Sequence, residues 1–221
     1  MRYKDLHTLS VENPRFFWRQ RMNLIDWYEE PEKVLYEDDD GLNRWFRGGK
    51  LNTSYLALDY HVDHGRGRQV ALFFDSAVTH TRRRYTFREL RDEVAKFAGA
   101  LRHQGVEKGD RVIIYMPMIP EAVISMLACA RLGAVHSVVF GGFAPHELAV
   151  RIDDAKPKAL ITASCGIEFK NIINYKPLVD AALEEAEHPP SSVIVFPRPH
   201  ANAEMIAGRD HDWHDLMHGA E

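Results

Sequence analysis

Residues 111–140 read RVIIYMPMIPEAVISMLACARLGAVHSVVF, and this stretch decides the fold. Residues 111–115 form a run of strand length that is apolar after its arginine, residues 121–132 are apolar on nearly every side of a helix, and residues 135–140 form a second strand-like run. Gly133 follows the helical segment, where a helix C-terminus favours glycine. Apolar strands separated by helices are typical of a parallel sheet that is covered on both faces.

The alternation of strands and helices continues on both sides of this stretch. Thr86 and Glu89 form a capping-box pattern, and apolar residues recur at helical spacing from there until Gly105. The other expected segments are a hairpin at 70–74 and 84–86, a helix opened by Pro145, a strand at 159–163, a helix from Pro177 to about Glu187, and a strand at 193–196. The sequence therefore predicts a doubly wound α/β fold, with a mostly parallel sheet flanked by helices.

The composition changes along the chain and predicts three regions. Residues 1–69 are rich in aromatic, charged and turn residues, with helical periodicity only in short pieces such as 14–25, so we expect an irregular N-terminal extension. Residues 70–196 carry the alternating pattern and form the α/β body. Residues 197–221 are polar, rich in histidine and short of core residues, which predicts a polar tail.

The overall composition excludes several classes of protein. The 221 residues include 28 Lys and Arg against 32 Asp and Glu, so the formal net charge is −4, which argues against a dedicated nucleic-acid binder. No apolar stretch follows the N-terminal residues, so we expect no secretory signal, and no apolar run is long enough to span a bilayer. We therefore expect a cytoplasmic protein without a membrane partner. No clear transit peptide is present, but the mitochondrial matrix stays open as a location.

Several familiar motifs are missing. The two cysteines, Cys129 and Cys165, have no spacing that encodes a disulfide framework or a zinc site, and we expect Cys129 to be a small core residue. The run Gly48-Gly-Lys50 lacks the other residues of a nucleotide-binding phosphate loop, and Gly65-Arg-Gly67 lacks the third glycine of a dinucleotide-binding motif. No G-x-S-x-G elbow occurs. A nicotinamide-dependent enzyme and a serine hydrolase therefore have little support.

Histidines near the end of the sequence fit two hypotheses, a metal site or a solvated helix. They stand at i, i+3 and i+7, so on one helix they would share a face with an aspartate beside them: His211, His214 and His218, with Asp215. The hypothesis that we favour is a solvated terminal helix that Trp213 and Leu216 dock to the body. His61 and His64 are also three residues apart, but they lie in a Gly- and Asp-rich stretch that we interpret as a loop.

The candidate site is the segment Val138-Val-Phe-Gly-Gly-Phe143, where a parallel strand ends and a helix is about to begin. Ligands of open α/β sheets bind beyond the carboxyl ends of the strands. Two glycines would let a ligand approach the main chain, the amides of the next helix would attract a phosphate, and Phe140 or Phe143 would cover an adenine or an acyl-carrier arm. The same pattern also fits a tight turn whose aromatic residues belong to the core, and the residues alone leave both hypotheses open.

Longer stretches carry a more specific pattern. Residues 45–62 read WFRGGKLNTSYLALDYHV, residues 112–121 read VIIYMPMIPE, and residues 128–143 read ACARLGAVHSVVFGGF. Together they resemble the short-chain AMP-forming acyl-CoA synthetases. Three further stretches look more like propionyl-CoA synthetases than acetyl-CoA synthetases, namely RIDDAKPK at 151–158, ASCGIE at 163–168 and YKPL at 175–178. The resemblance extends from about residue 5 to residue 218.

This resemblance implies a ligase reaction in two steps. A short-chain carboxylate, propionate or acetate, attacks the α-phosphate of ATP and gives an acyl-adenylate and pyrophosphate; the thiol of CoA then displaces AMP. Magnesium and cationic side chains offset the phosphate charge. ATP with Mg²⁺ and CoA are therefore expected as small-molecule substrates of the complete enzyme. We expect none of them to be firmly bound to this chain. We also expect no catalytic residue and no metal ligand in this chain.

The resemblance also implies that this chain is the first third of such an enzyme. In the family, a phosphate loop of the form T-S-G-S/T-T-G-x-P-K, the acyl pocket, an acidic adenine- and ribose-binding motif and a small domain with a catalytic lysine all follow the region equivalent to 197–221. We therefore expect the chain alone to be inactive and its exposed apolar surface to favour self-association. The alternatives are a stand-alone module that binds CoA or a nucleotide, and an interaction domain that has lost the ligand.

Two family contacts to CoA can be compared with this sequence. The family uses a Phe-Gly-Gly turn at the mouth of the CoA channel, and Phe140, Gly141 and Gly142 match it. A second contact comes from an arginine in the form G-I-E-P-G-R, but here Asn171 stands at the arginine position, and a neutral amide cannot make the charged bidentate contact. We interpret the neighbouring Lys170 as a solvated surface charge, so the second contact is not carried over.

Overall fold

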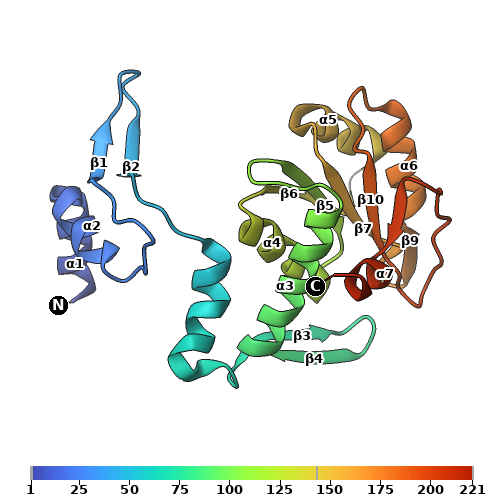
Figure 1. Cartoon of the computed structure of the whole chain (residues 1–221), viewed down its shortest axis with the longest axis horizontal. Helices are drawn as coiled ribbons and strands as arrows, with labels where there is room; N and C mark the ends of the chain where they lie inside the picture. Colours follow the sequence, from blue (N-terminus) through green and yellow to red (C-terminus); the bar gives the residue numbers. More distant parts are fainter. Residues whose placement is uncertain (1, 143, 221) are drawn as a thin grey trace. The chain divides into compact units, whose positions relative to one another are not determined.

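The computed structural model describes residues 2–142 and 144–220, which form two compact units that divide between Asn52 and Thr53 (Figure 1). Residues 53–69, which the composition assigned to the N-terminal extension, group with the second unit. The division into an N-terminal extension (1–69), an α/β body (70–196) and a polar tail (197–221) remains a prediction from the sequence. No described helix is both long enough and apolar enough to cross a membrane.

The first unit contains two helices and one antiparallel hairpin: α1 (Tyr3–Glu12), α2 (Pro14–Met22), β1 (Lys33–Glu37) and β2 (Asn43–Arg47). The side chain of Asn13 caps α2 by accepting a hydrogen bond from the N–H of Phe16. Asp38 closes the hairpin turn by accepting from the N–H of Leu42 at 2.8 Å and from Arg44 at 2.6 Å. The stretch predicted to be irregular therefore holds regular elements that local caps and turns stabilise.

The second unit opens with helical turns and a hairpin: η1 (Tyr55–Asp59), η2 (Val62–Arg66), β3 (Val70–Ser76) and β4 (Thr81–Thr86). η1 and η2 have π-helical hydrogen bonding. The loop predicted around His61 and His64 is wrong for His61, which lies in the helical turns. His64 and Gly65 have non-helical dihedral angles that interrupt these turns, and the φ of 79° at Gly65 is the left-handed conformation that glycine adopts without strain. The His64 ring stacks on Tyr60 with centroids 4.0 Å apart.

A five-stranded parallel sheet forms the centre of the second unit. In spatial order its strands are β11 (Asp210–Asp212), β10 (Ser192–Phe196), β7 (Ala159–Ala163), β5 (Arg111–Met116) and β6 (Val135–Phe140). Ile114 of β5 pairs with Val138 on one side and with Ile161 on the other. β5, which comes first in the chain among these five strands, therefore lies inside the sheet. The strand order reverses between β5 and β7, which is the topological switch point of a doubly wound sheet.

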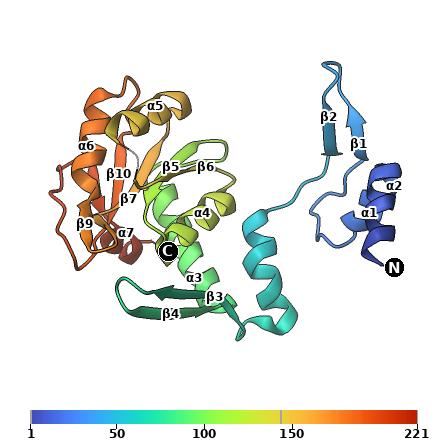
Figure 2. The same cartoon turned by 180° about the vertical axis from the view of Figure 1, so that it is seen from behind.

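Helices cover both faces of this sheet (Figure 2). One face carries α3 (Phe87–His103), α4 (Pro120–Leu132) and α7 (Trp213–His218), and the other carries α5 (Pro145–Ala155) and α6 (Tyr175–Glu185). Alternate residues of β5 serve the two cores: Val112 and Ile114 pack on the first face, and Ile113 and Tyr115 on the second. The predicted doubly wound α/β fold is confirmed.

Cys129 is fully buried in the first of these cores, as expected, and burial raises the pKa of its thiol to about 12. From residue 111 onward, three elements were not anticipated. An antiparallel hairpin of β8 (Cys165–Glu168) and β9 (Asn171–Asn174) follows β7, and β11 comes from the region predicted to be a polar tail. The helix expected from Pro177 begins two residues earlier, at Tyr175.

Candidate functional site

The Phe-Gly-Gly turn lies at the carboxyl end of β6, between that strand and α5. Phe140 is 67% exposed and Gly142 is exposed, whereas Gly141 is buried. Phe143, the second aromatic residue considered for covering a ligand, lies outside the described residues. The turn thus presents one aromatic side chain and one glycine backbone to solvent at the edge of the sheet where ligands of open α/β folds bind.

Gly141 has a packing partner within the chain. A Cβ atom placed on Gly141 would lie 2.2 Å from Oη of Tyr175, so this position excludes any side chain while Tyr175 stays where it is. The carbonyl oxygen of Gly141 accepts a buried hydrogen bond from the hydroxyl of Tyr115 at 3.0 Å. Burial, together with the nearby Tyr175 and Glu168, raises the pKa of Tyr115 to about 12, so this hydroxyl remains a donor at neutral pH.

Gly142 has a different environment. A Cβ atom there would lie 2.5 Å from Cε1 of Phe140, which means that the Phe140 ring lies against the glycine. The sequence left two hypotheses open, a ligand-binding turn and a tight turn packed on the core. The tight turn explains why position 141 is a glycine, because Tyr175 fills the space of a side chain there. The ring of Phe140 and the residue Gly142 are the exposed parts of this turn.

The β8–β9 hairpin contains Asn171, the position at which the resembled family has a CoA-contacting arginine. Phe169 and Lys170 form its tip, and Phe169 is 93% exposed with a φ of 53°. Asn171 is exposed and pairs with Glu168 across the hairpin. Lys170 is exposed too, in agreement with its interpretation as a surface charge.

The histidines do not form the helical face that a metal site would need. His211 lies in β11, while His214 and His218 lie in α7, and no group of three potential ligands occurs among the residues that the structure describes. The favoured docking hypothesis is confirmed, because Trp213 is 3% exposed and stacks on Phe97 with ring centroids 3.7 Å apart.

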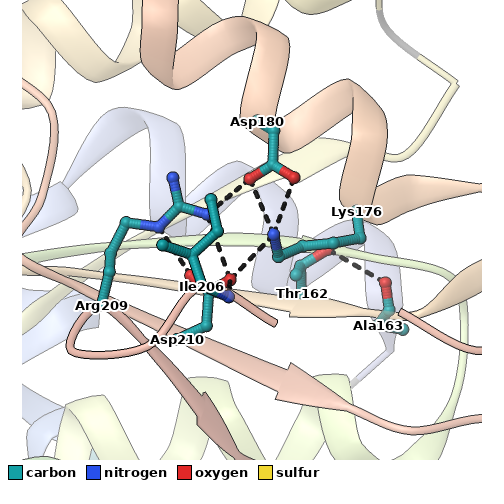
Figure 3. Close-up of polar contacts among 7 residues, drawn as sticks. All are labelled: Thr162, Ala163, Lys176, Asp180, Ile206, Arg209 and Asp210. Carbon is teal, nitrogen blue, oxygen red and sulfur yellow. Dashed lines mark hydrogen bonds and ion pairs between the residues drawn. The ribbon is translucent and has the colours of Figure 1, made fainter. Parts of the chain in front are cut away.

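The sequence did not reveal a network of four charges, of which Lys176 and Asp210 are buried and Asp180 and Arg209 are partly exposed (Figure 3). Nζ of Lys176 lies 2.7 Å from both carboxylate oxygens of Asp180 and 2.8 Å from Oδ2 of Asp210, and Arg209 bonds to both aspartates. The hydrogen bonds that Arg209 donates to Asp210 and Asp180 raise the pKa of Arg209 against the opposing effect of burial. The four-residue spacing of Lys176 and Asp180 was a visible signal, but the partners at 209 and 210 come from a distant segment. With two cations and two anions matched, the network joins α6 to β11.

A pocket of about 360 Å³ lies on the opposite face of the sheet, lined by Arg83, Tyr85, Glu121 and Trp213 among others. Nη2 of Arg83 donates to Oε1 of Glu121 at 2.8 Å, and the second carboxylate oxygen is buried without a hydrogen-bond partner among the described residues. Burial raises the pKa of Tyr85. The ion pair ties β4 to the first turn of α4, where the helix dipole favours a carboxylate.

Comparison with known families identifies the architecture. The model of the AMP-binding enzyme family matches residues 61–217. The chain belongs to the AMP-binding enzymes. A second model, the acetyl-coenzyme A synthetase N-terminus, matches residues 3–57, so the two models together cover nearly the whole chain.

Individual relatives agree with this assignment. The chain is 58% identical over 221 residues to an uncharacterized protein of Pseudomonas aeruginosa, covering all of this chain and 35% of that protein. It is 42% identical over 218 residues to the propionate–CoA ligase of Escherichia coli, covering 99% of this chain and 35% of the ligase. The solved acetoacetyl-CoA synthetase from Streptomyces lividans superposes with a TM-score of 0.85 at 28% identity, covering 99% of this chain and 33% of that one.

The chain therefore spans about a third of the length of these relatives. The resemblance to short-chain acyl-CoA synthetases is confirmed, and so is the similarity to their N-terminal part. Which residues contact CoA, and which acid is used, are matters for the proposal below.

Proposed function

We propose that this chain is the N-terminal part of a ligase that activates a short-chain carboxylate with ATP and transfers the acyl group to CoA, and that the chain alone does not catalyse adenylation. The observation that carries the proposal is the match of 99% of this chain to one third of a propionate–CoA ligase. Propionate is preferred to acetate on sequence resemblance alone. ATP, Mg²⁺ and CoA would be small-molecule substrates of the complete enzyme, and a cytoplasmic location remains a prediction.

Within this function, the Phe140–Gly142 turn would form one side of the opening through which CoA enters. The exposed ring of Phe140 offers an apolar face to the adenine or to the pantetheine arm. The exposed backbone at Gly142 permits close approach. Gly141 would act indirectly, by allowing Tyr175 to pack beneath the turn. No residue of this chain is assigned to Mg²⁺ or to the acyl group.

Exchange of pyrophosphate into ATP tests whether the chain alone catalyses adenylation. The purified chain is incubated with propionate or acetate, ATP, Mg²⁺ and labelled pyrophosphate, beside the Escherichia coli ligase as a positive control. We expect exchange with the ligase and background exchange with the chain. Robust acid-dependent exchange by the chain would show that it carries the adenylation chemistry itself.

A titration with CoA tests the turn and the alternative function. We expect millimolar CoA to shift the amide resonances of Phe140 and Gly142 in two-dimensional NMR spectra, with weak affinity because most of the channel would lie elsewhere. Phe140→Ala should abolish these shifts, whereas Phe73→Ala, which removes an equally exposed ring from β3, should keep them. Micromolar affinity would favour a stand-alone CoA-binding module, and shifts confined to other regions would contradict the assigned contact.

A further inference from the structure

The phenol end of Tyr175 lies between two glycines from different segments. A Cβ atom on Gly141 would lie 2.2 Å from Oη of Tyr175, and one on Gly166 would lie 2.4 Å from the same oxygen. Gly141 belongs to the turn after β6, and Gly166 belongs to β8. One side chain thus fills the space that a methyl group would need at either position.

The two glycines contact opposite edges of the ring. The ring atoms nearest to the Gly141 position are Cζ and Cε2, at 2.6 and 2.7 Å, and those nearest to the Gly166 position are Cζ and Cε1, at 2.5 and 2.6 Å. Tyr175 is only 4% exposed. A rigid ring that is close-packed on both edges transmits a displacement from one edge to the other, because a protein interior leaves no free volume to absorb it.

Both ends of this arrangement are anchored. The N–H of Tyr175 donates to the carbonyl oxygen of Ser164 at 3.1 Å, which fixes the start of α6 against the end of β7. The ring of Tyr115, a fully buried residue of β5, lies 5.1 Å from that of Tyr175 at an angle of 41°. The Tyr115 hydroxyl donates to Gly141, so the turn is held on one side by a hydrogen bond and on the other by the Tyr175 ring.

We propose that Tyr175 is a positioning residue that couples the Phe140–Gly142 turn to the β8–β9 hairpin, so that the two segments move as one unit. In the proposed function the turn is one side of the CoA opening, and the hairpin would be the neighbouring side. The meaning of the coupling for CoA rests on that proposed function, whereas the coupling itself concerns only this chain.

The experiment measures amide hydrogen exchange in both segments after a change in only one of them. The three atoms nearest to an alanine Cβ at position 141 all belong to Tyr175, and Gly141 does not have a positive φ, so the substitution adds no backbone strain of that kind. We expect Gly141→Ala to raise exchange about tenfold in the turn and also in residues 165–174, and Gly166→Ala to raise exchange about tenfold in the turn. Gly219→Ala is the matched control, because its Cβ would be 3.8 Å from the nearest atom, and it should change neither segment.

A double-mutant cycle identifies Tyr175 as the carrier of the coupling. Tyr175→Leu removes the atoms that touch both glycines but keeps an apolar side chain in the core. In this background, adding Gly141→Ala should leave exchange in residues 165–174 unchanged. If Tyr175→Leu does not fold by circular dichroism, Tyr175→Phe provides the second cycle, in which loss of Oη should reduce the effect of Gly141→Ala on the hairpin.

Two results would overturn the proposal: an effect of Gly141→Ala confined to the turn, or an equal effect on the hairpin with and without the Tyr175 substitution. Hydrogen exchange requires no CoA, so these results are independent of the titration described above. Coupled hydrogen exchange without CoA-induced NMR shifts would support the coupling and reject the CoA contact. CoA-induced shifts without coupled hydrogen exchange would support the CoA contact and reject the coupling.

Discussion

Nζ of Lys176 lies 2.8 Å from Oδ2 of Asp210, and the two side chains are 1% and 0% exposed. They join the first turn of α6 to the outermost strand of the sheet, β11, which has only three residues. A strand so short and so polar contributes little apolar burial of its own. Its attachment therefore depends on this ion pair and on its backbone pairing with β10.

Asp210→Asn should destabilise the second unit strongly. The substitution keeps the shape of the side chain but leaves Lys176 and Arg209 with a single carboxylate, and breaking a buried pair from one side costs about 3–5 kcal/mol. Urea unfolding followed by tryptophan fluorescence measures the loss. Asp75→Asn is the matched control, since Asp75 pairs with Arg82 but is 63% exposed, and it should cost less than about 1 kcal/mol. Equal losses in the two variants would show that the buried network does not hold β11.

The same carboxylate should make stability depend on pH. Burial alone would raise the pKa of Asp210, but hydrogen bonds from Arg209, Lys176 and the N–H of Ile206 outweigh burial and hold the pKa below its usual 3.8. Because the folded-state pKa is the lower one, the stabilisation is present above the unfolded-state pKa and is lost as the pH falls through the folded-state value.

We therefore expect the urea midpoint to fall as the pH is lowered from about 5 to about 3, and to fall less steeply in Asp210→Asn, so that the two curves approach each other in acid. Titrations with parallel curves for the two proteins would contradict the assignment of this acid sensitivity to Asp210.

Asp59→Asn should loosen the helical turns η1 on the body of the second unit. Arg131 of α4 donates from Nη1 and Nη2 to the two oxygens of Asp59 at 2.7 and 3.0 Å, and Asp59 is 17% exposed. Loss of this bidentate, partly buried contact should cost about 1.5–3 kcal/mol and raise amide exchange in residues 55–59. Asp92→Asn, which affects an exposed pair with Arg91, is the control. Unchanged exchange in η1 would contradict this role.

Tyr115→Phe should destabilise the turn after β6. The variant leaves the carbonyl oxygen of Gly141 without its buried donor, which costs about 1–3 kcal/mol. Thermal unfolding gives the magnitude, and amide exchange in residues 139–142 locates the effect. Tyr3→Phe, at a residue that is 82% exposed, should leave both unchanged. A Tyr115→Phe protein as stable as the unmodified chain would mean that water satisfies Gly141 instead.

Much of the fold was predictable because most strands of the parallel sheet carry apolar runs of strand length. Residues 111–115, 135–140 and 159–163 each became a strand of the parallel sheet, and the capping box of Thr86 and Glu89 starts α3 as expected. β11 was not predictable, because Asp-His-Asp has no strand-like pattern; tertiary contacts to β10 and Lys176 create it. His61 was misjudged because the Gly- and Asp-rich stretch suggested a loop, whereas His64 and Gly65 only interrupt the helical turns.

For the candidate site, the sequence located the turn but not the reason for its glycines. Phe140, Gly141 and Gly142 were visible as a pattern at the end of a strand. The partner of Gly141 is Tyr175, which lies beyond the next helix and strand, and single-sequence periodicity carries no information about such a contact. The same limitation hid the pair of Arg83 and Glu121 and the partners of Lys176.

The position of β11 has a consequence for synthesis of the protein. Strand β10 emerges from the ribosome before Asp210–Asp212 does, so during this part of translation one edge of β10 has unpaired backbone groups and Lys176 lacks its Asp210 partner. An unpaired, apolar strand is a template for the same strand in a neighbouring nascent chain. Crowded polysomes would therefore favour mispairing during this interval, and slower translation initiation should increase the yield of correctly folded protein.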